Sequence, residues 1–83
     1  MQYIATFFSH FGALRFERLC KTKGYAAQVR PVPRRLSSSC GSCVYFTASA
    51  LRAESLAQLR TPELEQLVCE TCAGYEFLYQ AEE

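Results

Sequence analysis

The chain has 83 residues, a formal net charge of +1, 49% hydrophobic residues and 20% charged residues. This composition is typical of a globular domain and excludes a disordered chain. The small net charge gives no electrostatic footprint for nucleic acid or for an anionic membrane. We therefore expect a single domain over residues 1–83 with one modest core, because a chain of this size leaves much of its surface in water.

The first eight residues alternate polar and apolar side chains and lack the basic region and long apolar stretch of a signal peptide. No segment approaches the roughly 20 apolar residues that a membrane span needs. These patterns predict a cytoplasmic protein. Five cysteines in a reducing compartment are better interpreted as metal ligands or as redox and transfer groups than as a disulfide framework.

The first half of the chain begins with a predicted strand and a predicted helix. Residues 3–8 are rich in β-branched and aromatic side chains, which favour a strand. Ser9 is a suitable N-cap for a helix over residues 9–23, and Gly24 can end that helix in a left-handed conformation.

Two more strands follow, separated by a loop. Residues 25–32 predict an edge strand, because the prolines at positions 31 and 33 cannot donate to a sheet. Residues 34–42 are rich in Ser and Gly and predict a loop, which leads into a strand over residues 43–47.

The second half contains two helix-prone segments. Residues 48–60 are only loosely amphipathic, whereas Thr61-Pro62-Glu63 is a cap, a first-turn proline and an acid that predict a helix over residues 62–72. Three apolar side chains of that helix fall on one face: Leu64, Leu67 and Val68. Residues 75–79 predict a last strand, and residues 80–83 are expected to fray.

The order β-α-β-β-α-β is the signature of a ferredoxin-like split βαβ sandwich, an α+β fold with two helices on one face of a four-stranded antiparallel sheet. With the strand order 4-1-3-2, three connections emerge at the same end of the sheet. We therefore expect residues 9–10, 37–43 and 69–74 to share one edge.

Cys40 is the leading candidate for a reactive group, because it stands in a loop of small residues whose hydroxyls and N–H groups could hydrogen-bond a thiolate, the form that attacks and carries. Arg34 and Arg35 would favour the anion, and Gly41 permits a tight turn that exposes the sulfur. The alternative is an ordinary loop cysteine beside ordinary turn serines.

His10 is the only histidine and stands at the start of the first predicted helix. It is either a surface residue of the helix end or a general acid that stabilises or protonates a sulfur anion. Cys20 falls on the apolar stripe of the same helix, which favours a buried filler. The chain has no Ser-His-Asp order, phosphate loop or dinucleotide fingerprint, so a self-sufficient hydrolase or kinase is not expected.

Two Cys-x-x-Cys pairs, Cys40/Cys43 and Cys69/Cys72, raise an alternative function. Paired spacing of this kind suits tetrahedral zinc, so the chain could be a zinc-binding or structural module that uses all four thiols. On a helix over residues 62–72, the second pair could instead be packing residues or a resolving thiol pair. A thiol–disulfide oxidoreductase using Cys40 and Cys43 is disfavoured, because a strand and not a helix is predicted after the motif.

Three segments carry a family resemblance: Tyr3-Ile4-Ala5-Thr6-Phe7, Ser9-His10-Phe11-Gly12-Ala13-Leu14, and Pro31-Val32-Pro33-Arg34-Arg35-Leu36-Ser37-Ser38-Ser39-Cys40-Gly41. Through them, nearly the whole chain resembles the small bacterial selenium/sulfur carrier-like family. The resemblance implies that Cys40 is the carrier cysteine, cradled by Ser38, Ser39 and Gly41. Cys43 and the Cys69/Cys72 pair depart from the family's usual pattern.

The function implied by this resemblance is that of a non-enzymatic carrier without a cofactor. Cys40 would accept sulfur or selenium as a persulfide or selenosulfide from a donor such as a cysteine desulfurase-like enzyme. A second protein, the acceptor, would then remove it.

Overall fold

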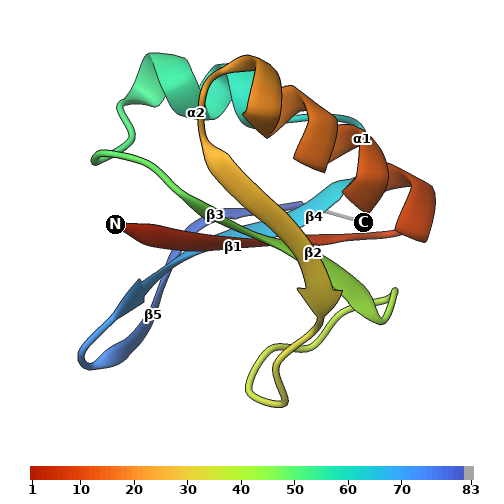
Figure 1. Ribbon diagram of the computed structural model, residues 1–83. Coiled ribbons are helices and arrows are strands. Elements are labelled where there is room, and N and C mark those ends of the chain that lie inside the picture. The colour runs from red at the N-terminus through yellow and green to blue at the C-terminus, as the bar shows by residue number, and fades with distance from the viewer. Residues whose placement is uncertain (82–83) are drawn as a thin grey trace.

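A computed structural model of the chain describes residues 1–81. These residues form one antiparallel sheet in the order β2-β3-β1-β4-β5, with both helices on one face (Figure 1). The elements in chain order are β1 (Gln2–Phe7), α1 (His10–Thr22), β2 (Ala26–Pro31), β3 (Ser42–Thr47), α2 (Ala53–Leu59), β4 (Leu64–Thr71) and β5 (Gly74–Gln80).

The expected α+β class, the two helices and the antiparallel sheet are confirmed, but the expected sheet of four strands is wrong. Strands β1 to β4 follow the order of a ferredoxin-like sheet, and β5 adds a fifth strand beside β4. The segment predicted as the fourth strand, residues 75–79, lies within this additional strand. Gln80 is also part of β5, so it does not fray, while residues 82–83 lie outside the described part of the chain.

The prediction of a helix over residues 62–72 is wrong, because Leu64–Thr71 is the strand β4. This strand pairs with β1 on one side and with β5 on the other, so both sides of its backbone are hydrogen-bonded. The pairing with β1 joins residues far apart in sequence, which no local pattern reveals. The cap-like residues before it make a turn, in which the Leu64 N–H donates to the Thr61 carbonyl at 3.1 Å. The second helix is instead α2, within the loosely amphipathic residues 48–60.

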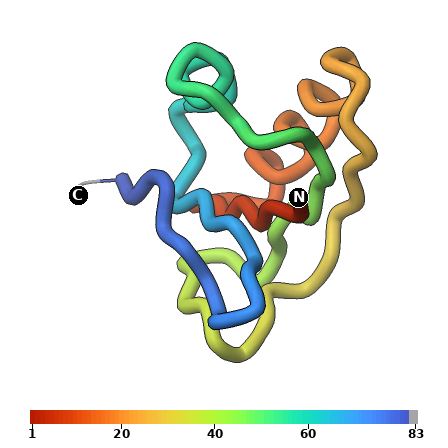
Figure 2. Tube along the Cα trace, turned by 90° about the vertical axis from the view of Figure 1, so that its left-hand side faces the viewer, coloured from red at the N-terminus to blue at the C-terminus, as the bar shows by residue number. Residues whose placement is uncertain are grey.

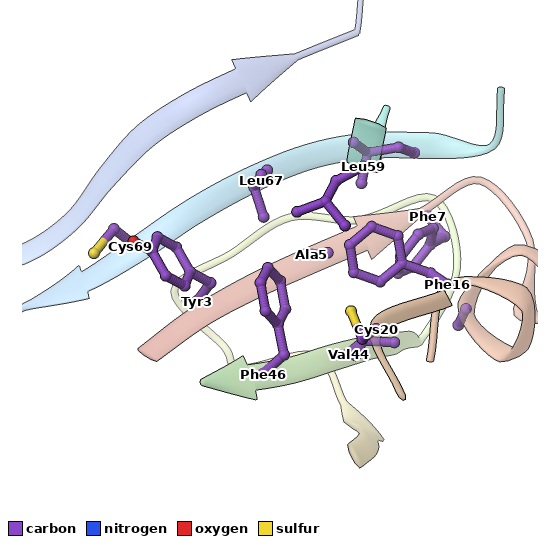
Figure 3. Close-up of a cluster of buried hydrophobic side chains, with 12 residues drawn as sticks. Tyr3, Ala5, Phe7, Phe16, Cys20, Val44, Phe46, Leu59, Leu67 and Cys69 are labelled. Carbon is purple, nitrogen blue, oxygen red and sulfur yellow. The ribbon is translucent and has the colours of Figure 1, made fainter. Parts of the chain in front are cut away.

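The main core fills the space between the helices and the sheet (Figure 3). Its aromatic side chains form a chain of contacts in which the Phe16 ring of α1 lies 5.1 Å from that of Phe7 and 5.5 Å from that of Phe46. Cys20 is fully buried in this layer, which confirms its expected role as filler. The Ser9 cap is also confirmed, because its hydroxyl accepts the Gly12 N–H at 3.1 Å.

The loop between β2 and β3 covers part of the opposite face of the sheet. Figure 2 shows residues 32–41, in yellow-green, on the side of the sheet away from both helices. Leu36 from this loop is only 5% exposed, and it packs with Ile4, Cys43 and Val68 in a second, smaller core. The loop is therefore packed onto the sheet, and this packing positions the candidate site.

Candidate functional site at the Cys40 loop

The carboxylate of Glu65 ties the serines of the loop to β4. Its Oε1 accepts the Ser38 hydroxyl at 2.9 Å, and its Oε2 accepts the Ser39 hydroxyl at 2.8 Å and shares the Ser39 N–H at 3.2 Å. Thr6 of β1 adds a hydroxyl at 3.3 Å. Next to Glu65, the Gln66 amide donates to the Ser37 carbonyl at 2.6 Å. Two consecutive residues of β4 thus hold three consecutive serines.

A break in the strand register explains how neighbouring side chains reach the same loop. On a regular strand, successive side chains point to opposite faces of the sheet. Here Thr6 pairs with Gln66 whereas Phe7 pairs with Leu64, so Glu65 is skipped in the β1–β4 ladder. An extra residue of this kind is a β-bulge, which re-aims a side chain. The bulge lets Glu65 and Gln66 both contact the loop.

The environment of Glu65 favours its ionised form. Partial burial by itself would raise the pKa of this carboxyl, but the hydrogen bonds from Ser39, Ser38 and Thr6 together outweigh burial and lower the pKa below its ordinary value. Glu65 is therefore a carboxylate at neutral pH. This fixed negative charge accepts hydrogen bonds from the Ser38 and Ser39 hydroxyls, which are therefore not free to donate to other groups.

Cys40 follows these serines directly, and its backbone N–H donates to the Ser38 hydroxyl oxygen at 3.3 Å. The Ser39 hydroxyl donates to Glu65, and the Ser38 hydroxyl lies within hydrogen-bond distance of both Glu65 and the Phe7 carbonyl. They hold the shape of the loop beneath Cys40. The expected role of Ser38 and Ser39 as a cradle for a thiolate stays a prediction, because in the structure their hydroxyls donate to the Glu65 carboxylate.

His10 approaches the other side of the loop. It is the first residue of α1, and its Nδ1 lies 2.8 Å from the hydroxyl of Ser42, the first residue of β3. Arg34 and Arg35 are exposed in the turn at the start of the loop. Within residues 1–81 neither arginine forms an ion pair.

The five cysteines differ sharply in accessibility. Burial raises the pKa of Cys20 to about 12 and the pKa of Cys43 to about 11, against the weaker opposing effects of Lys23 and Arg30 respectively. Cys69 is only 1% exposed. Cys40 is half-buried and Cys72 is exposed. Since the thiolate is the reactive form, Cys40 and Cys72 are the two thiols available for chemistry.

A comparison with known protein families matches residues 2–69 to the family described as "Putative Se/S carrier protein-like". The chain belongs to this family. The match includes β1, α1, the whole Cys40 loop and most of β4, and it confirms the resemblance seen in the sequence. Neither curated proteins nor solved structures gave a match to the chain.

In this member of the Se/S carrier-like family, the two Cys-x-x-Cys pairs are not brought together. Cys43 pairs with Thr6 and Cys69 pairs with Tyr3, so the two cysteines are offset by three positions, or about 10 Å, along β1, and β1 also lies between their strands. They also lie on opposite faces, because Cys43 belongs to the smaller core and Cys69 to the main core. Within the described residues, no group of three or more His, Cys, Asp or Glu side chains could hold a metal ion.

The expectation that residues 69–74 share an edge with the Cys40 loop is also wrong. It assumed that a helix would end at that edge, whereas β4 starts there and runs away from it. The residues that do meet the loop are at the beginning of β4, and Glu65 and Gln66 were missed for this reason. The available signal was a segment of strand length between two turns with the apolar run Leu67-Val68-Cys69 at its centre, which suits a buried strand as well as a helix.

No helix in the described part of the chain is long and apolar enough to cross a membrane.

Proposed function

We propose that this protein is a sulfur or selenium carrier that holds the chalcogen on Cys40. One observation supports the assignment to this residue above all others. The family match over residues 2–69 includes four cysteines, and of these Cys20, Cys43 and Cys69 are buried while Cys40 is accessible. The exposed Cys72 lies beyond the matched region.

The proposed reaction is a transfer between two thiols. The Cys40 thiolate attacks the outer sulfur of a donor persulfide, a new S–S bond forms at Cys40, and the old S–S bond breaks. The donor cysteine leaves as a thiolate with the electron pair, so no external oxidant or reductant is needed. Selenium would follow the same steps as a selenosulfide. A second protein, the acceptor, would attack the outer atom and release Cys40 again.

The surrounding residues support this chemistry in different ways. Arg34 and Arg35 add positive charge at the start of the loop, which favours a thiolate. His10, held next to Ser42, is a candidate proton donor to the sulfur anion. Ser38 and Ser39 hold the loop by their hydrogen bonds, and Gly41 leaves open space next to Cys40. All five cysteines are free, which suits the reducing cytoplasm in which we expect the carrier to work.

Intact-mass spectrometry tests the proposal. The protein is incubated with a cysteine desulfurase and cysteine, and the mass is measured without reductant. We expect one added sulfur atom on the parent and on Cys72→Ser, and none on Cys40→Ser. If Cys40→Ser gains sulfur as readily as the parent, the assignment to Cys40 is wrong.

A further inference from the structure

A pocket of about 230 Å³ lies between α2 and the part of the sheet formed by β4 and β5. Leu67 of β4 lines it from within, since this residue is fully buried in the main core. The other apolar walls are side chains that are exposed or only partly buried: Leu56 and Ala57 of α2, and Leu78 and Tyr79 of β5. The Cys40 loop covers the opposite face of the sheet, so the pocket is separate from the candidate carrier site (Figure 2).

A second β-bulge builds one wall of this pocket. Leu67 pairs with Tyr79 and Val68 pairs with Phe77, so Leu78 is skipped in the β4–β5 ladder. Successive side chains of a regular strand point to opposite faces, but Leu78 and Tyr79 both pack against the main core, on the helix side of the sheet. Both residues lie beyond residues 2–69, so membership of the Se/S carrier-like family does not account for this wall.

Arg60 is the only charged residue among the described residues that line the pocket. It follows the last residue of α2, and its guanidinium carbon lies 4.6 Å from the centre of the Tyr79 ring. Within residues 1–81 no acidic side chain forms an ion pair with it. The contact with Tyr79 therefore holds a positive charge at the rim of an apolar pocket, and no acid in the described part of the chain neutralises it.

The charge and the volume of the pocket indicate the chemistry of a ligand. A planar guanidinium donates two parallel hydrogen bonds to a carboxylate, and its single positive charge matches a monoanion. A dianion such as phosphate would place a second negative charge beside apolar side chains without a partner. An apolar cavity of about 150 Å³ holds a benzene molecule, so this pocket has room for a phenyl ring with about two further carbon atoms.

We propose that the pocket binds a small monocarboxylic acid whose apolar body is about the size of a phenyl ring. The apolar body packs against Leu56, Leu67 and Leu78, and the carboxylate accepts hydrogen bonds from Arg60. Burial of the apolar body supplies affinity, and Arg60 selects the acid over neutral compounds of the same shape. This site is independent of the proposed carrier function, because it uses neither Cys40 nor its loop.

The proposal is tested by titrating isotope-labelled protein with phenylacetate and following the backbone amide signals by NMR. Phenylacetamide is the neutral probe of the same shape. We expect phenylacetate to shift the signals of α2 and β5 with a Kd of about 1 mM, which suits a ligand of this size. Phenylacetamide should shift the same signals but bind about tenfold more weakly, because it cannot accept a charge-assisted hydrogen bond from Arg60.

Three variants separate the charge of the pocket from its shape. Arg60→Gln should bind phenylacetate about tenfold more weakly than the parent and should bind phenylacetamide like the parent. Arg52→Gln is the matched control, because Arg52 is an exposed arginine at the other end of α2 whose side chain makes no cap hydrogen bond and does not line the pocket. It should bind both probes like the parent. Ala57→Leu fills the pocket from an exposed helix position and should weaken the binding of both probes by about tenfold or more.

The proposal is overturned if phenylacetate shifts no signal of α2 or β5, or if both probes bind the parent with equal Kd. It is also overturned if Arg60→Gln, or an Ala57→Leu variant shown to be folded by circular dichroism, binds phenylacetate as tightly as the parent. Shifts confined to the Cys40 loop would do the same, because Arg34 and Arg35 would then be the partners of the anion. Sulfur loading of Cys40 plays no part in these titrations, so their outcome is separate from that of the carrier proposal.

Discussion

Replacing Glu65 by alanine should loosen the Cys40 loop and destabilise the protein. Alanine leaves Ser38 and Ser39 without their shared carboxylate acceptor and removes the acceptor of Thr6 as well. A hydrogen bond to a charged group contributes about 1.5–3 kcal/mol, and an exposed donor recovers much of this from water. Ser39 is exposed, whereas Thr6 is fully buried and Ser38 is half-buried. We therefore count Thr6 in full and Ser38 only in part, because the Phe7 carbonyl at 3.3 Å remains as an acceptor for the Ser38 hydroxyl.

The expected loss is about 2–3 kcal/mol in the free energy of unfolding at neutral pH. For a domain of this size it should lower Tm by roughly 10–20 °C. The measurement is thermal and urea unfolding followed by circular dichroism. Glu70→Ala is the matched control on the same strand, because Glu70 is exposed and its carboxylate accepts one hydrogen bond from the described residues, from the Gln2 amide at 2.8 Å. It should change stability by less than about 0.5 kcal/mol.

The pH dependence follows from the lowered pKa of Glu65 in the folded state, which the hydrogen bonds bring about despite the opposing effect of burial. A carboxyl group whose pKa is lowered by folding stabilises the folded state fully at pH values above its unfolded-state pKa. This stabilisation is lost as the pH falls through its folded-state pKa. The difference between the parent and Glu65→Ala should consequently shrink in acid. A difference below about 0.5 kcal/mol at neutral pH, or one that grows in acid, would refute the role assigned to Glu65.

Further predictions concern individual side chains. At about pH 8 the native protein should take up iodoacetamide at Cys40 and Cys72 only, because burial raises the pKa of Cys20 and Cys43 and shields Cys69; peptide mapping that finds early labelling of Cys43 would contradict this. Gly12→Ala should cost about 1–3 kcal/mol, since its new Cβ would lie 2.7 Å from the Cβ of Glu63, whereas Gly41→Ala meets no atom within 4 Å and should be nearly neutral in the same urea unfolding. Cys69→Ser should lower the free energy of unfolding by about 1–3 kcal/mol, because it places a hydroxyl in the main core, whereas Cys72→Ser should leave it unchanged, because Cys72 is exposed. Equal stabilities of the two variants would contradict the burial of Cys69. Arg34→Ala combined with Arg35→Ala should slow alkylation of Cys40 at neutral pH and lose this effect in high salt, and an unchanged rate would remove the arginines from the mechanism.

The first half of the fold could be predicted because local and tertiary preferences agree there. The strand at residues 3–8 and the helix at residues 9–23 differ from β1 and α1 by one residue at each end. Ser9 caps the helix as its residue type indicates, and Gly24 has the positive φ of 81° that was expected at the helix end. In such segments each residue's own preference already favours the final structure.

The second half could not be predicted in the same way, because the stability of β4 depends on partners far away in sequence. Its residues pair with β1, 57–66 positions earlier in the chain, and on the other side with β5 in a hairpin. The ladder with β1 leaves no local trace. The spacing of Leu64, Leu67 and Val68 suits one helix face, yet the strand places Leu67 in the main core and Val68 in the smaller one. Both faces of this inner strand are covered, which removes the alternation that normally identifies a strand.

The candidate site also combines a local feature, which the sequence shows, with a long-range contact, which it does not. The sequence identifies Cys40, because a reactive thiol in a Ser-rich loop is a local feature. What holds that loop depends on the skipped pairing at Glu65, since only the bulge turns Glu65 and Gln66 toward the same three serines. A helix over the same residues would place Glu65 and Gln66 about 100° apart and leave the serines without these hydrogen-bond partners. The serine run is therefore best explained as the part of the loop that binds β4, which leaves Cys40 as the first residue beyond the anchor and the one free to react.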